Sequence, residues 1–145
     1  MRITINYVAS KEDLEKCIEI RRTVFVEEQG IPEEIEMDDY KSETINFLAL
    51  INEKHVGTAR YKHTQYGVKL ERFSVLSPYR NLGVGKSLVE FIINSIDNKG
   101  SNIYLHAQDQ VINFYSHLGF EVIGEKFYEA DIQHQKMIYV GKVRL

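Results

Sequence analysis

The residues best suited to chemistry form the glycine-containing run Arg80–Ser87, which is Arg-Asn-Leu-Gly-Val-Gly-Lys-Ser. Gly83 and Gly85 let the backbone come close to a ligand. Apolar residues follow at helical spacing, so the run leads into a helix N-terminus, where free N–H groups and the helix dipole attract anions. The run therefore predicts a phosphate or pyrophosphate site, to which Arg80 and Lys86 add positive charge.

Three phosphate-binding patterns compete for this run, together with an ordinary glycine-rich connection that binds nothing. A Walker A loop requires a glycine where Arg80 stands, and the chain lacks a convincing apolar strand ending in a magnesium-binding aspartate. A dinucleotide fingerprint that starts at Gly83 requires a glycine at position 88, which is Leu88. The pattern Arg/Gln-x-x-Gly-x-Gly/Ala is met by Arg80, Gly83 and Gly85.

The stretch before the run predicts a β-strand with an irregularity. Apolar residues stand at Val68 and Leu70 and then at Phe73 and Val75, so their parity changes between the two pairs. A regular strand would turn its second half to the opposite face, whereas one extra residue near Glu71–Arg72, a β-bulge, restores the register. The alternative is a strand that is buried on both faces, in which apolar residues need not alternate with polar ones. We favour the bulge.

A second motif with chemical capacity is Asn113–Phe120, Asn-Phe-Tyr-Ser-His-Leu-Gly-Phe. It is predicted to end a short helix over Gln108–Leu118 that Gly119 caps. A tyrosine such as Tyr115 ordinarily has a pKa of about 10, stays protonated at neutral pH and can donate a proton. The competing interpretation is a core tyrosine on an apolar helix face.

Together, these two motifs resemble the GNAT N-acetyltransferase superfamily, in which an Arg/Gln-x-x-Gly-x-Gly/Ala loop precedes an aromatic-Tyr-x-x-x-Gly-Phe helix end. The resemblance implies that acetyl-CoA is the co-substrate, that no metal is needed, and that the bulged strand holds the pantetheine arm and thioester. Many members have a CoA-contacting asparagine seven positions before the tyrosine; Gln108 stands there, and its longer side chain leaves that contact open. The implied CoA-binding residues are Phe73, Ser74, Val75, Arg80, Asn81, Leu82, Gly83, Val84, Gly85, Lys86, Ser87, Gln108, Asn113, Phe114 and Tyr115.

The resemblance also implies a reaction, in which a primary amine attacks the thioester directly in a ternary complex. A backbone N–H near Val75 would face the developing oxyanion, and Tyr115 would act as general acid on the departing sulfur. Because an alkyl ammonium must lose a proton before it attacks, Glu71, His134 or His106 could serve as the general base. Some acetyltransferases need no dedicated base, so the base stays undecided at this point.

The N-terminal part predicts a strand over Arg2–Val8, followed by a helix that begins with the capping box Ser10–Asp13. Cys17 lies on the apolar face of this helix, so it is predicted to be a core residue rather than a nucleophile. As the single cysteine of the chain, it cannot form an intrachain disulfide. The predicted helical stripe is Leu14, Cys17, Ile18, Arg21, Val24 and Phe25.

The next segment, Val26–Asp39, is acidic and contains no basic residue. It is either a solvated loop or an acidic rim that attracts a cationic amine. Phe25–Gln29, followed by Ile31-Pro32, resembles a small bacterial GNAT branch of uncharacterised acetyltransferases, and His134 lies in a segment similar to that branch's acceptor-side loop. The acidic residues are Glu27, Glu28, Glu33, Glu34, Glu36, Asp38 and Asp39.

The predicted fold class is α/β (α+β). We expect a GNAT fold, with a mixed, mostly antiparallel central sheet of about six to seven strands, a β-bulge in the fourth strand, and flanking helices. With 145 residues and no internal repeat, the chain is expected to form a single domain over residues 1–145. Asn98-Lys99-Gly100 is predicted to end the helix that follows the run, and further strands are predicted over Ile45–Ile51, His55–Tyr61, Ile103–Ala107, Glu121–Glu129 and Gln135–Val143.

Composition excludes several classes of protein. Hydrophobic residues make up 43% and charged residues 27%, which is typical of a globular protein. The net charge is −3 without a basic block, which argues against nucleic-acid binding through phosphate contacts. No segment approaches about 20 apolar residues, and the first ten residues do not form a signal peptide, so neither a membrane partner nor export is expected. A cytoplasmic location follows by elimination.

The leading hypothesis is an acetyl-CoA-dependent N-acetyltransferase for a small or exposed amine, and the acidic segment favours a cationic one. The alternative is a non-catalytic acyl-CoA-binding module of the same fold, which would differ at Tyr115 and the base rather than at the glycine run. A P-loop nucleotidase is the third hypothesis. The acceptor's identity and the oligomeric state, a homodimer included, are left open.

Overall fold

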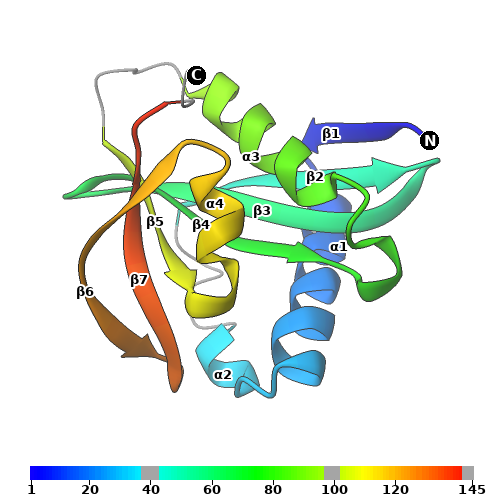
Figure 1. The fold of residues 1–145 in the computed structure, drawn as a ribbon. Coiled ribbons are helices and arrows are strands. Elements are labelled where there is room, and N and C mark those ends of the chain that lie inside the picture. Colours follow the sequence, from blue (N-terminus) through cyan, green and yellow to red (C-terminus); the bar gives the residue numbers. More distant parts are fainter. Residues whose placement is uncertain (37–42, 97–101, 142–145) are drawn as a thin grey trace. The chain divides into compact units, whose positions relative to one another are not determined.

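A computed structural model describes residues 1–36, 43–96 and 102–141 of the chain (Figure 1). Within these residues the strands form a seven-stranded mixed sheet in the order β1-β2-β3-β4-β5-β7-β6, which confirms the predicted fold class. The strands are β1 (Ile3–Tyr7), β2 (Ile45–Ile51), β3 (Lys54–Thr64), β4 (Gly67–Val75), β5 (Ile103–Gln108), β6 (Phe120–Glu129) and β7 (Ile132–Tyr139). The helices are α1 (Lys11–Arg21), the π-helix η1 (Arg22–Glu28), α2 (Glu33–Glu36), the 3₁₀ helix η2 (Ser77–Tyr79), α3 (Val84–Ser95), the 3₁₀ helix η3 (Asp109–Val111) and α4 (Ile112–Ser116).

The chain divides into two compact units. The first, the N-terminal unit, comprises Met1–Lys62 and Arg72–Ile96, and the second, the C-terminal unit, comprises His63–Glu71 and Asp97–Leu145. Strand β4 contributes residues to both units, because the division falls between Glu71 and Arg72. The expectation of a single domain over residues 1–145 stays a prediction.

The N-terminal unit places helices on both faces of β2, because successive strand residues point to opposite faces. Phe47 is fully buried and its ring meets Phe91 of α3 at 5.8 Å. Its neighbour Leu48 packs instead with Cys17 and Ile20 of α1. The strands β2 and β3 are joined by a tight turn with positive φ angles at Asn52 and Glu53 (48° and 71°), as a two-residue hairpin requires.

The sequence predicts the start of the first helix correctly, but it does not predict how the helix continues beyond Arg21. The Ser10 side chain accepts a bond from the Asp13 backbone N–H at 3.0 Å, as the capping box predicts. Cys17 is fully buried, and burial raises the pKa of its thiol, which confirms the predicted core role. Beyond Arg21, however, the helix continues as the π-helix η1, in which the Gln29 N–H donates to the Val24 carbonyl five residues back. Such helices are rare and often occur at functional sites.

The C-terminal unit is built on the sheet β4-β5-β7-β6. The first part of β4 runs parallel to β5, with Val68 opposite Ile103, and β5 and β6 each pair antiparallel with β7. Met137 of β7 is fully buried, and the tight turn between β6 and β7 has positive φ angles at Ala130 and Asp131. No helix among the described residues is long and apolar enough to cross a membrane.

Several predicted boundaries are wrong by a few residues. Gln108 ends strand β5 instead of beginning a helix, because a 3₁₀ turn separates it from α4, which spans only Ile112–Ser116. Strand β7 starts at Ile132, so His134 lies within a strand and not in a loop. The predicted helix stop over residues 98–100 lies outside the described residues, as do Asp38 and Asp39.

Candidate functional site

The predicted anion site lies in the N-terminal unit, at the start of α3. The helix begins at Val84. Gly85, Lys86 and Ser87 therefore belong to its first turn, whereas the sequence had suggested that they form a loop before it. Gly83 is the N-cap residue, with φ 92°, a left-handed conformation that favours glycine. Asn81, two positions earlier, is also left-handed, with φ 64°. The two left-handed residues turn the chain sharply from Arg80 into the helix.

The N-terminus of α3 offers backbone donors to an anion. The Ser87 N–H makes the first intrahelical bond, to the Gly83 carbonyl at 3.0 Å, so the four N–H groups before it have no partner inside the helix. Gly83 has no side chain to cap them, and no capping bond from another side chain is present among the described residues. The first turn carries Lys86 and no acidic residue. A diphosphate would therefore meet free amides, a favourable dipole and a cation.

The close packing beneath this turn depends on Gly57, which sequence analysis missed. A Cβ at Gly57 of β3 would lie 3.0 Å from Val84 Cγ1 and 3.1 Å from the Ser74 carbonyl oxygen. The glycine therefore lets the first residue of α3 and the second half of β4 approach β3 closely. Its only sequence signal is a glycine inside a strand, which can mark such an approach.

The positive charge of Arg80 beside the turn is paired with a carboxylate. Its Nη1 and Nη2 donate to the two carboxylate oxygens of Glu28, at 2.6 and 2.7 Å, and its Nε donates to the Val75 carbonyl at 2.9 Å. The pairing lowers the pKa of Glu28 and raises that of Arg80, through the hydrogen bonds first and the opposite charges second. Both groups are therefore ionised and their charges compensate each other.

The second half of β4 carries the predicted irregularity. Arg72 has φ 60°, a left-handed conformation in the middle of a strand, where the change of parity predicted an extra residue. Beyond it, Ser74 is buried and its hydroxyl donates to the Arg72 carbonyl at 3.1 Å, while Phe73 and Val75 are half-buried. The backbone of these three residues remains the predicted contact for the pantetheine arm.

The C-terminal unit holds a cluster of charged and imidazole side chains, which we call the polar cluster: Lys69, Glu71, His106, Glu129 and His134. Pairing of β4, β5, β7 and β6 brings these residues together, because Lys69 lies opposite Tyr104, two residues from His106, and Gln108 lies opposite His134. Lys69 Nζ lies 3.5 Å from Glu71 Oε1, and His106 Nδ1 lies 3.3 Å from Glu129 Oε2. Of these residues, sequence analysis missed Lys69 and Glu129.

The two histidines of the polar cluster are held in defined orientations. His134 is buried, and its Nδ1 lies 2.6 Å from the Ile132 carbonyl, an acceptor, so Nδ1–H donates and the orientation of the ring is fixed. His106 is oriented by Glu129, and the hydrogen bond from His106, with the nearby charges of Lys69 and His134, lowers the pKa of Glu129 to about 2. The phenyl ring of Phe127 contacts both imidazoles, with its centroid 5.0 Å from that of His106 and 6.0 Å from that of His134.

Tyr115 also belongs to the C-terminal unit. It is buried, and desolvation raises the pKa of its phenol well above the ordinary value, so the group stays protonated at neutral pH. Its ring packs edge-on against Phe114 and Phe120, at 5.0 and 5.8 Å. Asn113 and Phe114 are exposed, and the Gln108 side-chain oxygen accepts from Gln110 Nε2 at 2.9 Å. The predicted site residues thus fall into two sets, one in each unit.

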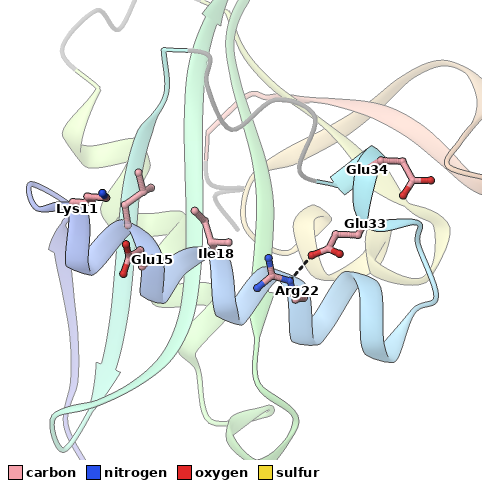
Figure 2. A pocket seen from close by; sticks show the side chains of 7 residues that line it. Lys11, Glu15, Ile18, Arg22, Glu33 and Glu34 are labelled. Atoms are coloured by element: carbon pink, nitrogen blue, oxygen red, sulfur yellow. Dashed lines mark hydrogen bonds and ion pairs between the residues drawn. The ribbon is translucent and has the colours of Figure 1, made fainter.

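The acidic segment is partly neutralised within the N-terminal unit. Glu28 pairs with Arg80. Glu33 Oε1 lies 2.7 Å from Arg22 Nε (Figure 2). Two carboxylates of the segment are therefore compensated by arginines outside it. Glu27 and Glu34 are exposed, and the acidic rim stays a prediction. The side chain of Glu36 is not among those described.

A pocket beside α1 has a volume of about 630 Å³. Figure 2 draws the side chains that line it. The predicted catalytic and CoA-binding residues do not line it. Among the described residues, no group of three or more His, Cys, Asp or Glu side chains could hold a metal ion. The lining residues are Lys11, Leu14, Glu15, Ile18, Arg22, Glu33 and Glu34.

Comparisons with known proteins agree on one family. A family model described as an acetyltransferase (GNAT) domain matches residues 8–140. The uncharacterized N-acetyltransferase YjcF of Bacillus subtilis is 34% identical over 131 residues, which cover 89% of this chain and 94% of that protein. An acyl-CoA N-acyltransferase structure from Pseudomonas aeruginosa superimposes with a TM-score of 0.84 at 23% identity, over 96% and 100% of the two chains. An N-acetyltransferase from Thermoplasma acidophilum in complex with coenzyme A gives a TM-score of 0.73 at 21% identity, over 96% and 99%.

Proposed function

Because the chain belongs to the GNAT acetyltransferase family, we propose that it is an acetyl-CoA-dependent N-acetyltransferase acting on a primary amine in a ternary complex. The observation that carries the proposal is the N-terminus of α3, where unpaired backbone N–H groups follow a left-handed glycine. Such a terminus suits a diphosphate. The coenzyme A complex of the Thermoplasma acidophilum protein, which has the same fold, supports the choice of ligand. We further propose that residues 1–145 act as a single catalytic domain.

In this proposal the start of α3 binds the diphosphate of the coenzyme, and Tyr115 and the polar cluster supply the proton-transfer groups. The diphosphate would lie against the amides of Gly83 to Lys86, and the backbone of Phe73–Val75 would hold the pantetheine arm. The amine nitrogen attacks the thioester carbon, the carbon–sulfur bond breaks, and the acetyl group becomes an amide. Holding the two reactants in line can contribute roughly 7–11 kcal/mol in favourable cases.

The departing thiolate would take a proton from the Tyr115 hydroxyl, which burial keeps protonated. The attacking amine would lose its proton to the polar cluster. The contact with Ile132 fixes the orientation of the His134 ring, whose Nε2 would accept the proton, and the Glu71 carboxylate lies 3.5 Å from Lys69 Nζ. Both remain proposed bases, and His106 lies in the same cluster.

The decisive experiment measures binding and turnover separately. Calorimetry with coenzyme A and with ATP tests the anion site: preferential binding of coenzyme A is expected, and preferential binding of ATP would contradict the proposal. Thiol release from acetyl-CoA is then followed across polyamines, aminoglycosides, amino acids and peptides with free amines. Turnover with one of these classes is expected, whereas tight coenzyme binding without turnover on any amine would indicate a non-catalytic acyl-CoA-binding module.

A further inference from the structure

Glu28 and Arg80 are 52 positions apart in the sequence and meet through two parallel hydrogen bonds of 2.6 and 2.7 Å. Arg80 also donates from Nε to the Val75 carbonyl, the last carbonyl of β4. One guanidinium therefore connects three parts of the N-terminal unit: the end of β4, the turn into α3, and the last residue of the π-helix η1.

This arrangement differs from an ordinary surface ion pair. A bidentate arginine–carboxylate contact has a fixed geometry and is stronger than a single charged hydrogen bond. The side chains are also only partly exposed, at 37% for Arg80 and 39% for Glu28. With its third bond to Val75, the Arg80 guanidinium has little freedom to rotate.

The turn that follows Arg80 needs such support. Asn81 and Gly83 both have positive φ angles, of 64° and 92°. Glycine and asparagine adopt left-handed conformations more readily than other residues, but they adopt other conformations as well, so contacts outside the turn are needed to hold this one. The same turn presents the free amides of α3, so its conformation decides whether those amides can converge on a diphosphate.

We propose that Glu28 is a positioning residue for the coenzyme: it fixes Arg80, and through Arg80 the turn into α3, in the conformation that binds the diphosphate. This inference rests on the proposed function. A guanidinium has five N–H groups, and three are used by Glu28 and Val75. One N–H on each Nη is left for a phosphate oxygen, so Arg80 can hold Glu28 and the coenzyme together.

The test is a double-mutant cycle read by calorimetric titration with coenzyme A. Glu28→Gln keeps the side-chain size but removes the charge and the bidentate contact, and should raise the Kd about tenfold. Arg80→Gln should raise it at least as much, and the double variant should bind no more weakly than Arg80→Gln alone, because Glu28 acts only through Arg80. In turnover assays, Glu28→Gln should raise the KM for acetyl-CoA and leave the KM for the amine unchanged.

A matched control lies in the same unit. Glu33 forms a 2.7 Å contact with Arg22 and is similarly exposed, but it does not reach the turn before α3. Glu33→Gln should therefore leave the Kd for coenzyme A unchanged. Glu28→Asp, which keeps the charge and shortens the reach, should give an intermediate Kd, and it serves as the test variant if Glu28→Gln does not fold.

Three results would overturn the inference while leaving the proposed function intact. They are wild-type or tighter binding by Glu28→Gln, additive losses in the double variant, and an equal loss in Glu33→Gln. Tighter binding would mean that Glu28 competes with the diphosphate for Arg80. Wild-type protein that binds no coenzyme A would overturn the proposed function, and this inference with it.

Discussion

The turn before α3 and the polar cluster offer different chemical groups, and we propose different roles for them. The turn presents backbone amides, whose direction is fixed by left-handed residues and by the Glu28–Arg80 contact. The polar cluster presents side chains, which three strand pairings bring together from β4, β5, β6 and β7. If the turn binds the coenzyme and the polar cluster transfers protons, as we propose, the two functions can be disturbed independently, because no residue of one region belongs to the other.

The largest expected effect is on the turn. Gly83→Glu places a side chain and a negative charge at the N-cap, where φ is 92°, and should lower the affinity for coenzyme A by at least about 100-fold. Calorimetric titration measures the loss. Gly124→Glu is the matched control, because Gly124 is also left-handed, with φ 77°, and has nothing within 4 Å of an added Cβ. If both variants lost affinity equally, the effect would come from backbone strain and the turn would lose its assigned role.

The next effect should fall on turnover alone. Tyr115→Phe removes the proposed general acid while keeping the edge-on ring contacts with Phe114 and Phe120. We expect kcat to fall about 100-fold, the lower end of what acid–base groups contribute, with little change in coenzyme affinity. Tyr128→Phe, at a tyrosine that is 72% exposed, should leave kcat unchanged. A fully active Tyr115→Phe variant would remove Tyr115 from the mechanism.

A smaller effect should separate the proposed bases. His134→Gln removes the Nε2 lone pair, and we expect kcat at neutral pH to fall about tenfold, because part of the amine is already deprotonated by solvent. His117→Gln is a close control. His117 also has its Nδ1 2.6 Å from a backbone carbonyl, but it is exposed and lies at the C-terminal end of α4, outside the polar cluster. The fall in kcat should shrink at high pH, where more amine is neutral. The same loss at every pH would point to Glu71 or to a structural role for His134.

The turn was largely predictable from the sequence because its determinants are local. Gly83, Gly85 and the helical spacing that follows are adjacent in the chain, and together they predict backbone donors at a helix start. The spacing could not fix the first residue of α3, which is Val84, since a glycine and a lysine fit a loop and a first helical turn equally well. The irregularity of β4 at Arg72 was predictable for the same local reason, the change of parity.

The contacts between distant residues could not be predicted. Glu28 was placed in a solvated loop or an acidic rim because nothing in its own segment reveals an arginine 52 positions away. Glu129 and Lys69 look like ordinary strand residues until the sheet register places them near His106. His134 was expected in a loop because its segment resembles an acceptor-side loop. The turn at Ala130 and Asp131, which contains neither glycine nor proline, did not reveal that the next strand begins at Ile132. Register and side-chain pairing are properties of the folded sheet.

The smallest expected effect concerns the Glu129–His106 contact within the polar cluster. The pKa of Glu129 is about 2 in the folded protein and 4.5 ordinarily, so the carboxylate stabilises the fold above about pH 4.5, and this contribution is lost as the pH falls towards 2. Glu129→Gln should therefore lower the free energy of unfolding at neutral pH by about 0.5–1 kcal/mol, a modest value because the side chain is 42% exposed. Urea unfolding measures this difference, which should shrink near pH 3. Glu125→Gln, on the exposed part of β6, is the control and should show no such pH dependence. A Glu129→Gln deficit that persists unchanged at low pH would mean that packing, and not the charge, links Glu129 to His106.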